Sequence, residues 1–480
     1  MSDFSVILTI VCVYFAVVLA IGLAAGRRNA STAEDYFLAG RSVKTVVLFM
    51  ALVGTNISPF VLMGIPGLAY HRGIGVFGQN ASIIVLGIPL SIYLIGLPSW
   101  RRARALGAVT PAELYAKHFE ARWFGWLVFG VYFVFTVPYM VTAVSGVGIA
   151  VDTFSGGAVS FEAAAAGILL VTLLYTGFGG MRGTMWTNVL QGSIFLVFSV
   201  VAFFLIADVR GGVAPTMREV VSAHPELMDV PNEGPFRIGP WASWGLGISL
   251  CVIAFPHMLV RIFAAQDEES LKNACRLYPA AMVMLWIPCV LFGVWGTLDF
   301  PALAGRASDA VFPLLIQRHL GPFAQGLALA SILAAVMSTL DAQMLTLSSM
   351  LTRDVLRNVR GDRQQIFLGR SFLVVLAAIT WIIAIRKPAS IFSIAALSFS
   401  GYVTLIPTMF LSMRWPSFSR AAATCSIVVG NLALVTSHTW GPKDALLLPV
   451  AWALLGGTMA AVFTTLLFPR RTRDTNTTDG

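Results

Sequence analysis

The 480-residue sequence has few charged residues and no polar segment long enough to form a separate soluble domain. Asp, Glu, Lys and Arg make up 11% of the chain, whereas a soluble protein carries about 25%. Hydrophobic residues make up 57% of the chain, and the mean hydropathy is +0.80. This composition excludes an ordinary soluble protein and predicts an all-α polytopic membrane protein, for which the lipid bilayer is an expected partner.

Sequence motifs for catalysis and for nucleotide binding are also missing. The chain has no Walker phosphate loop and no zinc-ligand spacing. The cysteines are odd in number and scattered, which indicates small core residues; they are Cys12, Cys251, Cys275, Cys289 and Cys425. We therefore expect no enzyme and no cofactor, and the same absence argues against an ATP-driven pump.

The chain has, instead, many apolar segments that can cross a bilayer, which takes roughly 20 residues per helix. Hydropathy predicts about thirteen spans. They lie near residues 5–26, 45–70, 74–97, 123–148, 160–177, 185–207, 243–266, 279–298, 322–352, 366–385, 388–413, 419–437 and 445–468. The longest connections are expected to be an irregular cap at 208–240 and a loop at 299–320 that ends in a short amphipathic helix.

Basic residues are distributed unevenly between the two sides of these spans. If the N-terminus lies outside, roughly 23 of the 32 Lys and Arg residues fall on the inner side, Arg261 among them. The net charge of +9 is then a sign of topology and gives no reason to expect a nucleic acid partner. We expect an integral protein of the cell (inner) membrane with its N-terminus outside and its C-terminus in the cytoplasm.

Two of the predicted spans are interrupted in the middle. In the span 45–70, residues 54–59 bring Gly, Thr, Asn, Ser and Pro together, and Pro59 must bend or unwind the helix. In the span 243–266, Gly245 and Gly247 weaken the helix, and Pro256 is followed directly by His257. Interrupted helices in separate halves of a chain indicate the central binding site of a transporter.

Polar residues also lie at mid-depth in the segment 331–354. Helical spacing puts Ala335, Ser338 and Asp341 on one side of this helix, with Thr339 beside them. The hydroxyl groups can bond neighbouring helices together, or they can serve as hard oxygen ligands of a small cation. An ionisable residue inside the membrane favours a functional site, and Asp341 is such a residue.

Four segments resemble the sodium:solute symporter family: EDYFLAGRS (34–42), GTNISPFVLMGIPGLAY (54–70), GGMRGTMWTNVLQG (179–192) and ILAAVMSTLDAQMLTLSSMLTRD (332–354). The resemblance implies a core of five plus five helices in inverted repeat, with discontinuous first and sixth core helices. It implies an extra helix and inner loop at 1–44, repeats at 45–207 and 208–413, and two C-terminal helices with a cytoplasmic tail at 414–480. Transport then proceeds by alternating access.

The resemblance also implies a sodium site and a substrate site. Na⁺, the coupling ion, would bind the backbone carbonyls of Gly54, Ile57 and Ala335 and the hydroxyls of Ser338 and Thr339. The substrate would lie beside it, and its candidate ligands are Asn56, Ser58, Phe255 and His257. His257 could equally be a structural hydrogen-bonding residue.

One triplet departs from the family pattern. Much of the family has Trp-Thr-Asp on the fifth core helix, and this Asp serves a second sodium in some members. Here the triplet is Trp186-Thr187-Asn188, so that second site cannot be carried over. Asp341 is the remaining candidate for a second cation or a proton, unless it only pairs with a neighbouring basic or hydroxyl group.

The segments 255–279 and 398–410 most resemble the pantothenate and monocarboxylate branch of the family. This favours a sodium-coupled symporter, able to function as a monomer, that imports a monocarboxylate or a similar organic anion. The alternative within transport is an amino acid or another neutral or zwitterionic solute. A polytopic membrane enzyme and a sensor are the alternatives outside transport.

Overall fold

The computed structural model describes residues 3–27, 32–356, 361–386, 390–442 and 445–470. The first ten helices are α1 (Asp3–Gly26), α2 (Ala33–Leu38), α3 (Thr45–Asn56), α4 (Ile65–Arg72), α5 (Gly75–Ser91), α6 (Leu97–Ala105), α7 (Pro111–His118), α8 (Arg122–Ser155), α9 (Phe161–Val209) and α10 (Val213–Ala223). The next ten are α11 (Ile238–Ala254), α12 (Pro256–Phe263), α13 (Glu268–Asp299), α14 (Val311–His319), α15 (Pro322–Met350), α16 (Asp362–Ala384), α17 (Ile391–Val403), α18 (Ile406–Arg414), α19 (Arg420–Trp440) and α20 (Pro449–Leu467).

Short π-helical segments connect or extend some of these helices: η2 (Phe60–Gly64) precedes α4, η3 (Ile92–Gly96) joins α5 to α6, and η7 (Leu351–Val355) extends α15. No strand occurs among the described residues, where the only bridge pairs Val43 with Ala265. The predicted all-α class is therefore confirmed.

Both predicted helix breaks occur where Pro59 and Pro256 lie. The pair α3 and η2–α4 bends by 52°, and the pair α11 and α12 bends by 50°. Ile57 ends α3 with an extended backbone (φ −85°, ψ 102°), and Phe255 ends α11 in the same way (φ −61°, ψ 126°). Each proline then starts the next helix, where its missing N–H costs no helical hydrogen bond.

Ten helices in the described part of the chain are long and apolar enough to cross a membrane, and counting each bent pair as one more span gives twelve. One of the ten, α9, is long enough for two spans, because its 49 residues would extend about 74 Å as a straight helix. A Cβ atom on Gly183 would lie only 3.8 Å from the carbonyl oxygen of Tyr175, so α9 folds back on itself. Counting its two limbs separately gives the thirteen predicted spans.

The fold-back of α9 depends on Gly180. This residue has φ 55° and ψ −154°, a conformation that only glycine adopts readily. A Cβ atom at this position would also lie 2.7 Å from the carbonyl oxygen of Tyr36. The inner loop that contains α2 therefore packs directly against the bend.

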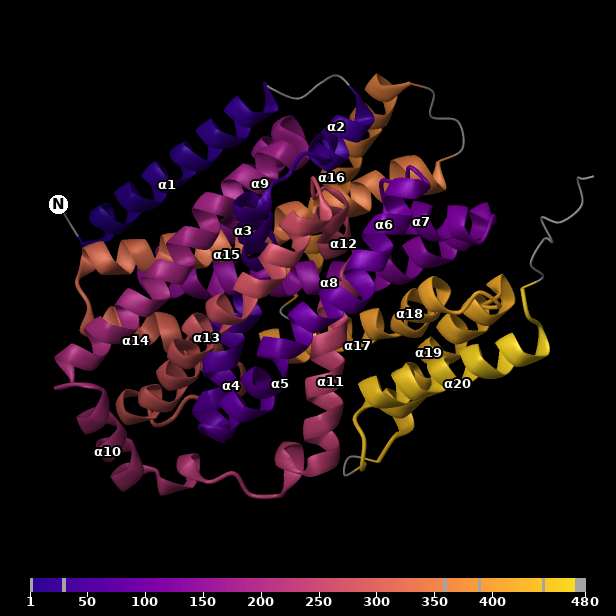
Figure 1. The fold of residues 1–480 in the computed structure, drawn as a ribbon. Coiled ribbons are helices and arrows are strands. Elements are labelled where there is room, and N and C mark those ends of the chain that lie inside the picture. The colour runs from indigo at the N-terminus through magenta and orange to yellow at the C-terminus, as the bar shows by residue number, and fades with distance from the viewer. Residues whose placement is uncertain (1–2, 28–31, 357–360, 387–389, 443–444, 471–480) are drawn as a thin grey trace, which may run out of the picture.

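The connections at the two ends of the molecule differ from the prediction in one place. The segment 208–240, expected to be irregular, contains the helix α10, whose buried Thr216 and Val220 lie four residues apart and form one face. The short helix expected at the end of 299–320 is present as α14. Figure 1 shows α10 and α14 at the lower left of the molecule and α2, α6 and α7 at its upper right.

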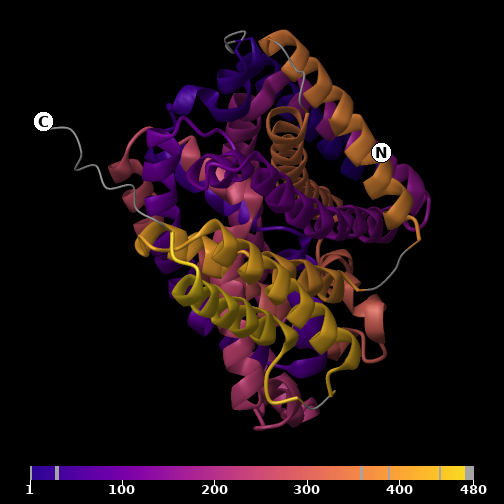
Figure 2. The same cartoon turned by 90° about the vertical axis from the view of Figure 1, so that its right-hand side faces the viewer.

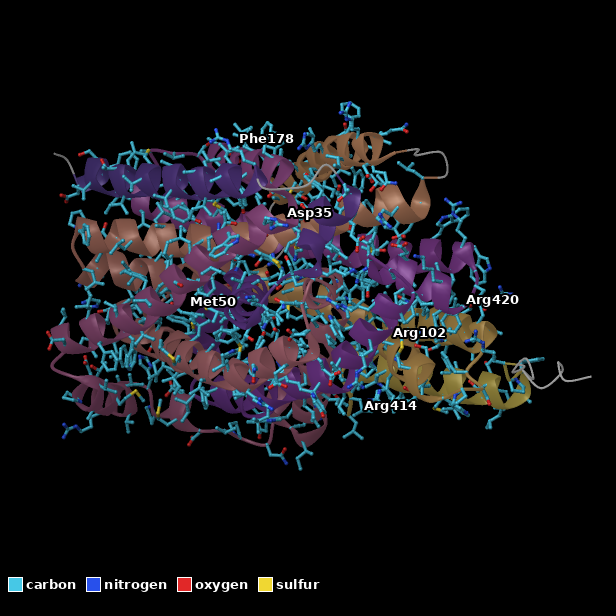
Figure 3. All side chains as sticks on the ribbon, turned by 45° about the horizontal axis from the view of Figure 1, so that its top comes forward. Asp35, Met50, Arg102, Phe178, Arg414 and Arg420 are labelled. Carbon is cyan, nitrogen blue, oxygen red and sulfur yellow. The ribbon has the colours of Figure 1, made fainter. Side chains whose placement is uncertain are left out.

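The most buried of the long membrane-spanning helices is α15, which packs against α1, α3, α8, α9 and α12. The last two helices, α19 and α20, lie side by side at the edge of the molecule and contact α11 and α17 (Figures 1 and 2). Figure 3 shows side chains filling the interior, with Met50 of α3 near the centre and Phe178 and Arg420 at the edge. The candidate site therefore lies in the interior, where α3 and α15 meet.

Candidate functional site

Four of the five sodium ligands implied by the family resemblance come together where α3 ends against α15. The Ser338 hydroxyl donates to the carbonyl oxygen of Gly54 at 2.8 Å and to that of Ala335 at 3.0 Å. The Thr339 hydroxyl lies 3.0 Å from the same Ala335 oxygen. All of these oxygen atoms are buried, and we refer to them as the sodium-site oxygens.

The fifth ligand, Ile57, is positioned by the break itself. It is the residue at which α3 leaves helical geometry, and its side chain is fully buried. Carbonyl and hydroxyl oxygens of this kind are ligands that hard cations prefer, and an interrupted helix can aim its carbonyls at an ion. The arrangement is suited to one small, weakly coordinated cation.

Three of the four candidate substrate ligands meet around Tyr139 of α8. The Tyr139 hydroxyl donates to Ser58 Oγ at 3.2 Å, and its ring centroid lies 5.5 Å from that of Phe255. The ring of His257 stacks on Phe255 at 5.2 Å. The fourth candidate, Asn56, lies beside the Tyr278 hydroxyl of α13, and Tyr278 also interacts electrostatically with Tyr139.

His257 is buried, and neither of its ring nitrogens has a hydrogen-bond partner among the described residues. A buried polar group without a partner is costly unless a ligand or water completes it. The imidazole can donate one hydrogen bond in its neutral form, and a carboxylate oxygen can accept it.

Aromatic side chains enclose this group from the other half of the chain. The ring centroid of Phe399 on α17 lies 5.1 Å from that of Tyr139 and 5.2 Å from that of Phe60. The ring of Phe60 stacks on that of Phe392, with the centroids 5.5 Å apart. Phe392 also lines a cavity of about 250 Å³, whose other lining residues include Trp244, Gln79 and Arg72. The stacked pair of Phe60 and Phe392 therefore connects the wall of this cavity with the aromatic rings around Tyr139.

Asp341, the candidate for a second cation or a proton, is fully buried and already has a cationic neighbour. Its Oδ1 lies 3.4 Å from Nη2 of Arg261 on α12, and the exposed fractions of the two side chains are 0% and 1%. The Tyr175 hydroxyl donates to Asp341 Oδ2 at 2.9 Å. We refer to Arg261 and Asp341 as the buried ion pair.

Asn188, which replaces the usual Asp, bridges the buried ion pair. With its amide oriented to match its neighbours, Oδ1 accepts from Nη2 and Nη1 of Arg261 at 2.7 and 3.0 Å, and Nδ2 donates to Asp341 Oδ2 at 3.2 Å. The same orientation lets Oδ1 accept from the Thr55 hydroxyl at 3.3 Å. Thr55 directly follows Gly54, so the ion pair and the sodium-site oxygens are linked through α3.

The position of Arg261 corrects the sequence-based account of the basic residues. Arg261 was counted on the inner side of the membrane, whereas the structure buries it in the protein interior. It lies six residues beyond the break at Phe255, still within α12.

Tyr139 and Tyr175 were not identified from the sequence, because a tyrosine in an apolar segment has no pattern that distinguishes a ligand from a core residue.

Comparison with known proteins gives one family. A model described as the sodium:solute symporter family matches residues 36–430. The chain is 29% identical to the sodium/pantothenate symporter of Escherichia coli K12 over 438 residues, which cover 87% of this chain and 88% of that protein. It is 27% identical to the sodium/proline symporter of the same strain over 456 residues, which cover 90% of this chain and 87% of that protein.

Solved structures give the same fold. A Na⁺-coupled sialic acid symporter in a substrate-bound, outward-open state has a TM-score of 0.81 at 17% identity, and the match covers 97% of this chain and 99% of that one. The nucleobase-cation-symport-1 family transporter Mhp1 in a closed conformation has a TM-score of 0.55 at 15% identity over 91% of this chain and 96% of that one. The likeness establishes the inverted-repeat transporter fold.

Proposed function

Because the chain belongs to the sodium:solute symporter family, we propose that it is a sodium-coupled symporter that imports a small monocarboxylate or a similar organic anion. Symport with Na⁺ follows from the family, in which the named relatives are sodium symporters and not enzymes. The chemical class of the solute does not follow from the family and is the further part of the proposal.

The observation that carries the sodium site is the meeting of the Ser338 and Thr339 hydroxyls with the Gly54 and Ala335 carbonyls at the end of α3. Ile57 would supply the remaining carbonyl. The hydroxyls donate to these carbonyls, and to bind Na⁺ they would turn their oxygens toward it. Na⁺ binding would thereby hold α3 against α15.

The substrate site is supported by the unpartnered imidazole of His257 beside Ser58, Phe255 and Tyr139. A carboxylate on the solute would accept a hydrogen bond from His257, and the aromatic rings would enclose the apolar part. Pantothenate carries a carboxylate, and the sodium/pantothenate symporter is the relative with 29% identity. Asn56 would contribute from the last position of α3.

An amino acid is the second candidate, and the sodium/proline symporter at 27% identity favours it. Amino acids also carry a carboxylate, so the same His257 would serve, and the difference lies in the added ammonium group.

We propose an inner-membrane protein with an outer N-terminus and a cytoplasmic C-terminus, on the basis of the uneven distribution of Lys and Arg. We further propose that a single chain transports.

Uptake by proteoliposomes tests this function. Radiolabelled lactate, pyruvate, pantothenate and proline are each supplied with an inward Na⁺ gradient and, as the control, with K⁺ of the same concentration. We expect Na⁺-dependent accumulation of one of the carboxylates and its loss in the Ser338→Ala/Thr339→Ala variant. Accumulation of proline alone would replace the anion proposal with the amino acid one, and equal uptake in K⁺ would contradict sodium coupling.

A further inference from the structure

We propose that the Arg261 guanidinium is a built-in cation that occupies the place of a second ion at Asp341, so that the protein binds one Na⁺ per chain. The inference rests on the proposed sodium symport and deepens it, since it sets the number of ions. It concerns the buried ion pair and Asn188, which the proposed sodium site does not use.

The contacts of Asp341 leave it little capacity for another cation. A carboxylate has about four lone-pair positions. Oδ1 faces the Arg261 guanidinium at 3.4 Å, while Oδ2 accepts from the Tyr175 hydroxyl at 2.9 Å and from the Asn188 amide at 3.2 Å. A sodium ion at this position would have to displace the guanidinium, and that would leave the buried Arg261 charge without a carboxylate.

Electrostatics explains why the pair is kept together. Removing one partner of a buried pair is strongly destabilising, because the other charge stays buried without compensation. An arginine side chain keeps its charge and cannot leave the protein with the solute. The positive charge at Asp341 therefore remains fixed to α12, whereas a sodium ion would be released at each cycle.

The amide at position 188 fits this arrangement. Asn188 Oδ1 accepts two hydrogen bonds from the guanidinium while its Nδ2 donates to Asp341, so a single neutral side chain bonds to both members of the pair. An aspartate at this position would bring a second carboxylate next to Asp341 and would need one more positive charge. Asn188 and Arg261 together thus balance the site without a second mobile ion.

The fixed charge lies next to the proposed sodium site. The Thr55 hydroxyl donates to Asn188 Oδ1 at 3.3 Å, and the Thr55 carbonyl oxygen lies 3.3 Å from the Thr339 hydroxyl. A Cβ atom on Gly54 would lie 3.2 Å from the Asn188 carbonyl oxygen, so the two helices are in backbone contact here. We therefore expect the pair to hold α3, α9, α12 and α15 in register around a single Na⁺.

Direct counting of bound ions tests the inference with Na⁺ itself as the probe. Purified full-length protein in nanodiscs is titrated with ²²Na⁺ in a scintillation proximity assay. We expect one Na⁺ per chain and a Hill coefficient of one. In the Ser338→Ala/Thr339→Ala variant we expect binding to fall at least tenfold, because no second site retains the ion.

The Arg261→Gln variant removes the guanidinium from the proposed second-ion position and keeps the Asp341 carboxylate. It should bind twice as many sodium ions as the wild type, with a second phase of its own affinity, and its melting temperature should rise with NaCl but not with KCl. The Arg261→Gln/Asp341→Asn variant removes both charges and should return to one ion. Tyr175→Phe is the matched control, because it removes a hydrogen bond to Asp341 without changing any charge, and it should bind one ion.

Two ions per wild-type chain, falling to one in Asp341→Asn, would overturn the inference while leaving sodium symport intact. A folded Arg261→Gln variant that binds only one ion would also overturn it. If Arg261→Gln does not fold, the wild-type count and the charge-free double variant still decide the question. No ²²Na⁺ binding by the wild type would instead contradict the proposed function.

Discussion

The Ser338 and Thr339 hydroxyls occupy consecutive positions of α15 but reach different parts of α3. Ser338 reaches the Gly54 carbonyl, and Thr339 reaches the carbonyl of Thr55. Both also share the Ala335 carbonyl of their own helix. Each hydroxyl therefore joins the two helices at the point where a bound ion would join them.

Removing either hydroxyl should weaken sodium activation. We expect Ser338→Ala or Thr339→Ala to raise the half-saturating Na⁺ concentration about tenfold or more, since a tenfold change corresponds to about 1.4 kcal/mol of lost ligand energy. Initial uptake rates across a series of Na⁺ concentrations measure this. Ser331→Ala is the matched control, because Ser331 is buried in the same helix and its hydroxyl has no partner within the described residues. An unchanged value in the double alanine variant would rule the site out.

His257 gives a second prediction for single residues. His257→Phe keeps the stacking on Phe255 but removes the N–H donor, so we expect KM for the solute to rise about 10- to 100-fold, the cost of a hydrogen bond to a charged group. The half-saturating Na⁺ concentration should stay within about twofold, because His257 is not one of the proposed sodium ligands. A purely structural histidine would instead lower the melting temperature and leave KM unchanged.

Among the elements, the fold-back of α9 is the most sensitive to a single substitution. Gly180→Ala adds a Cβ atom 2.7 Å from the Tyr36 carbonyl and strains a backbone that favours glycine, so we expect a loss of about 1–3 kcal/mol in stability. Fluorescence-detected gel filtration after heating measures this as a lower melting temperature.

Gly177→Ala is the control, because it lies in the same helix and a Cβ atom there would meet nothing within 4 Å. Similar melting temperatures for the two variants would show that the bend does not depend on Gly180.

The sequence predicted the elements that are marked by local chemistry. Pro59 and Pro256 predicted the two breaks because proline ends a helix wherever it occurs, and the hydroxyls of 338 and 339 were visible as polar residues at mid-depth. The partner of Asp341 was not predictable, because Arg261 is 80 residues away in the chain. Counting basic residues near span ends treats every arginine as a loop residue, which placed Arg261 outside the core.

The helix α10 was missed for a different reason, which is the composition of the segment that contains it. Val213, Met217, Val220 and Val221 recur at helical spacing within it, but the surrounding segment contains Pro, Gly and charged residues and was interpreted as irregular. The repeat boundaries at 44, 207 and 413, which follow from the family resemblance, stay a prediction.

For the whole molecule, Asp309 connects the segment η6 (Gly305–Ala310) to the start of α17. The N–H of Ile391 donates to Asp309 Oδ2 at 3.1 Å, and η6 also packs on α4. Burial raises the pKa of Asp309 to about 6, although the bond from Ile391 acts in the opposite direction. The folded protein therefore holds this proton more tightly than the unfolded chain does.

The sign of the pH dependence follows from that difference. Between about pH 4 and pH 6 the folded state binds more protons at Asp309 than the unfolded state, so this residue's contribution to stability decreases as pH rises and is constant above that range. Asp309→Asn keeps an acceptor for Ile391 but does not titrate. We expect the difference in melting temperature, variant minus wild type, to increase from pH 4 to pH 6. A difference that stays constant over this range would contradict the pKa assigned to Asp309.

The two helix breaks also place partial charges inside the protein, within the helix pairs that can span a membrane. The carboxyl end of α3 carries about half a negative charge, and it faces the proposed sodium site. The amino end of α12 carries about half a positive charge, and it begins at Pro256, directly before His257. In the proposed function, the end of α3 would favour the cation and the start of α12 would favour the carboxylate, so that the backbone would partly compensate the charges of the transported pair.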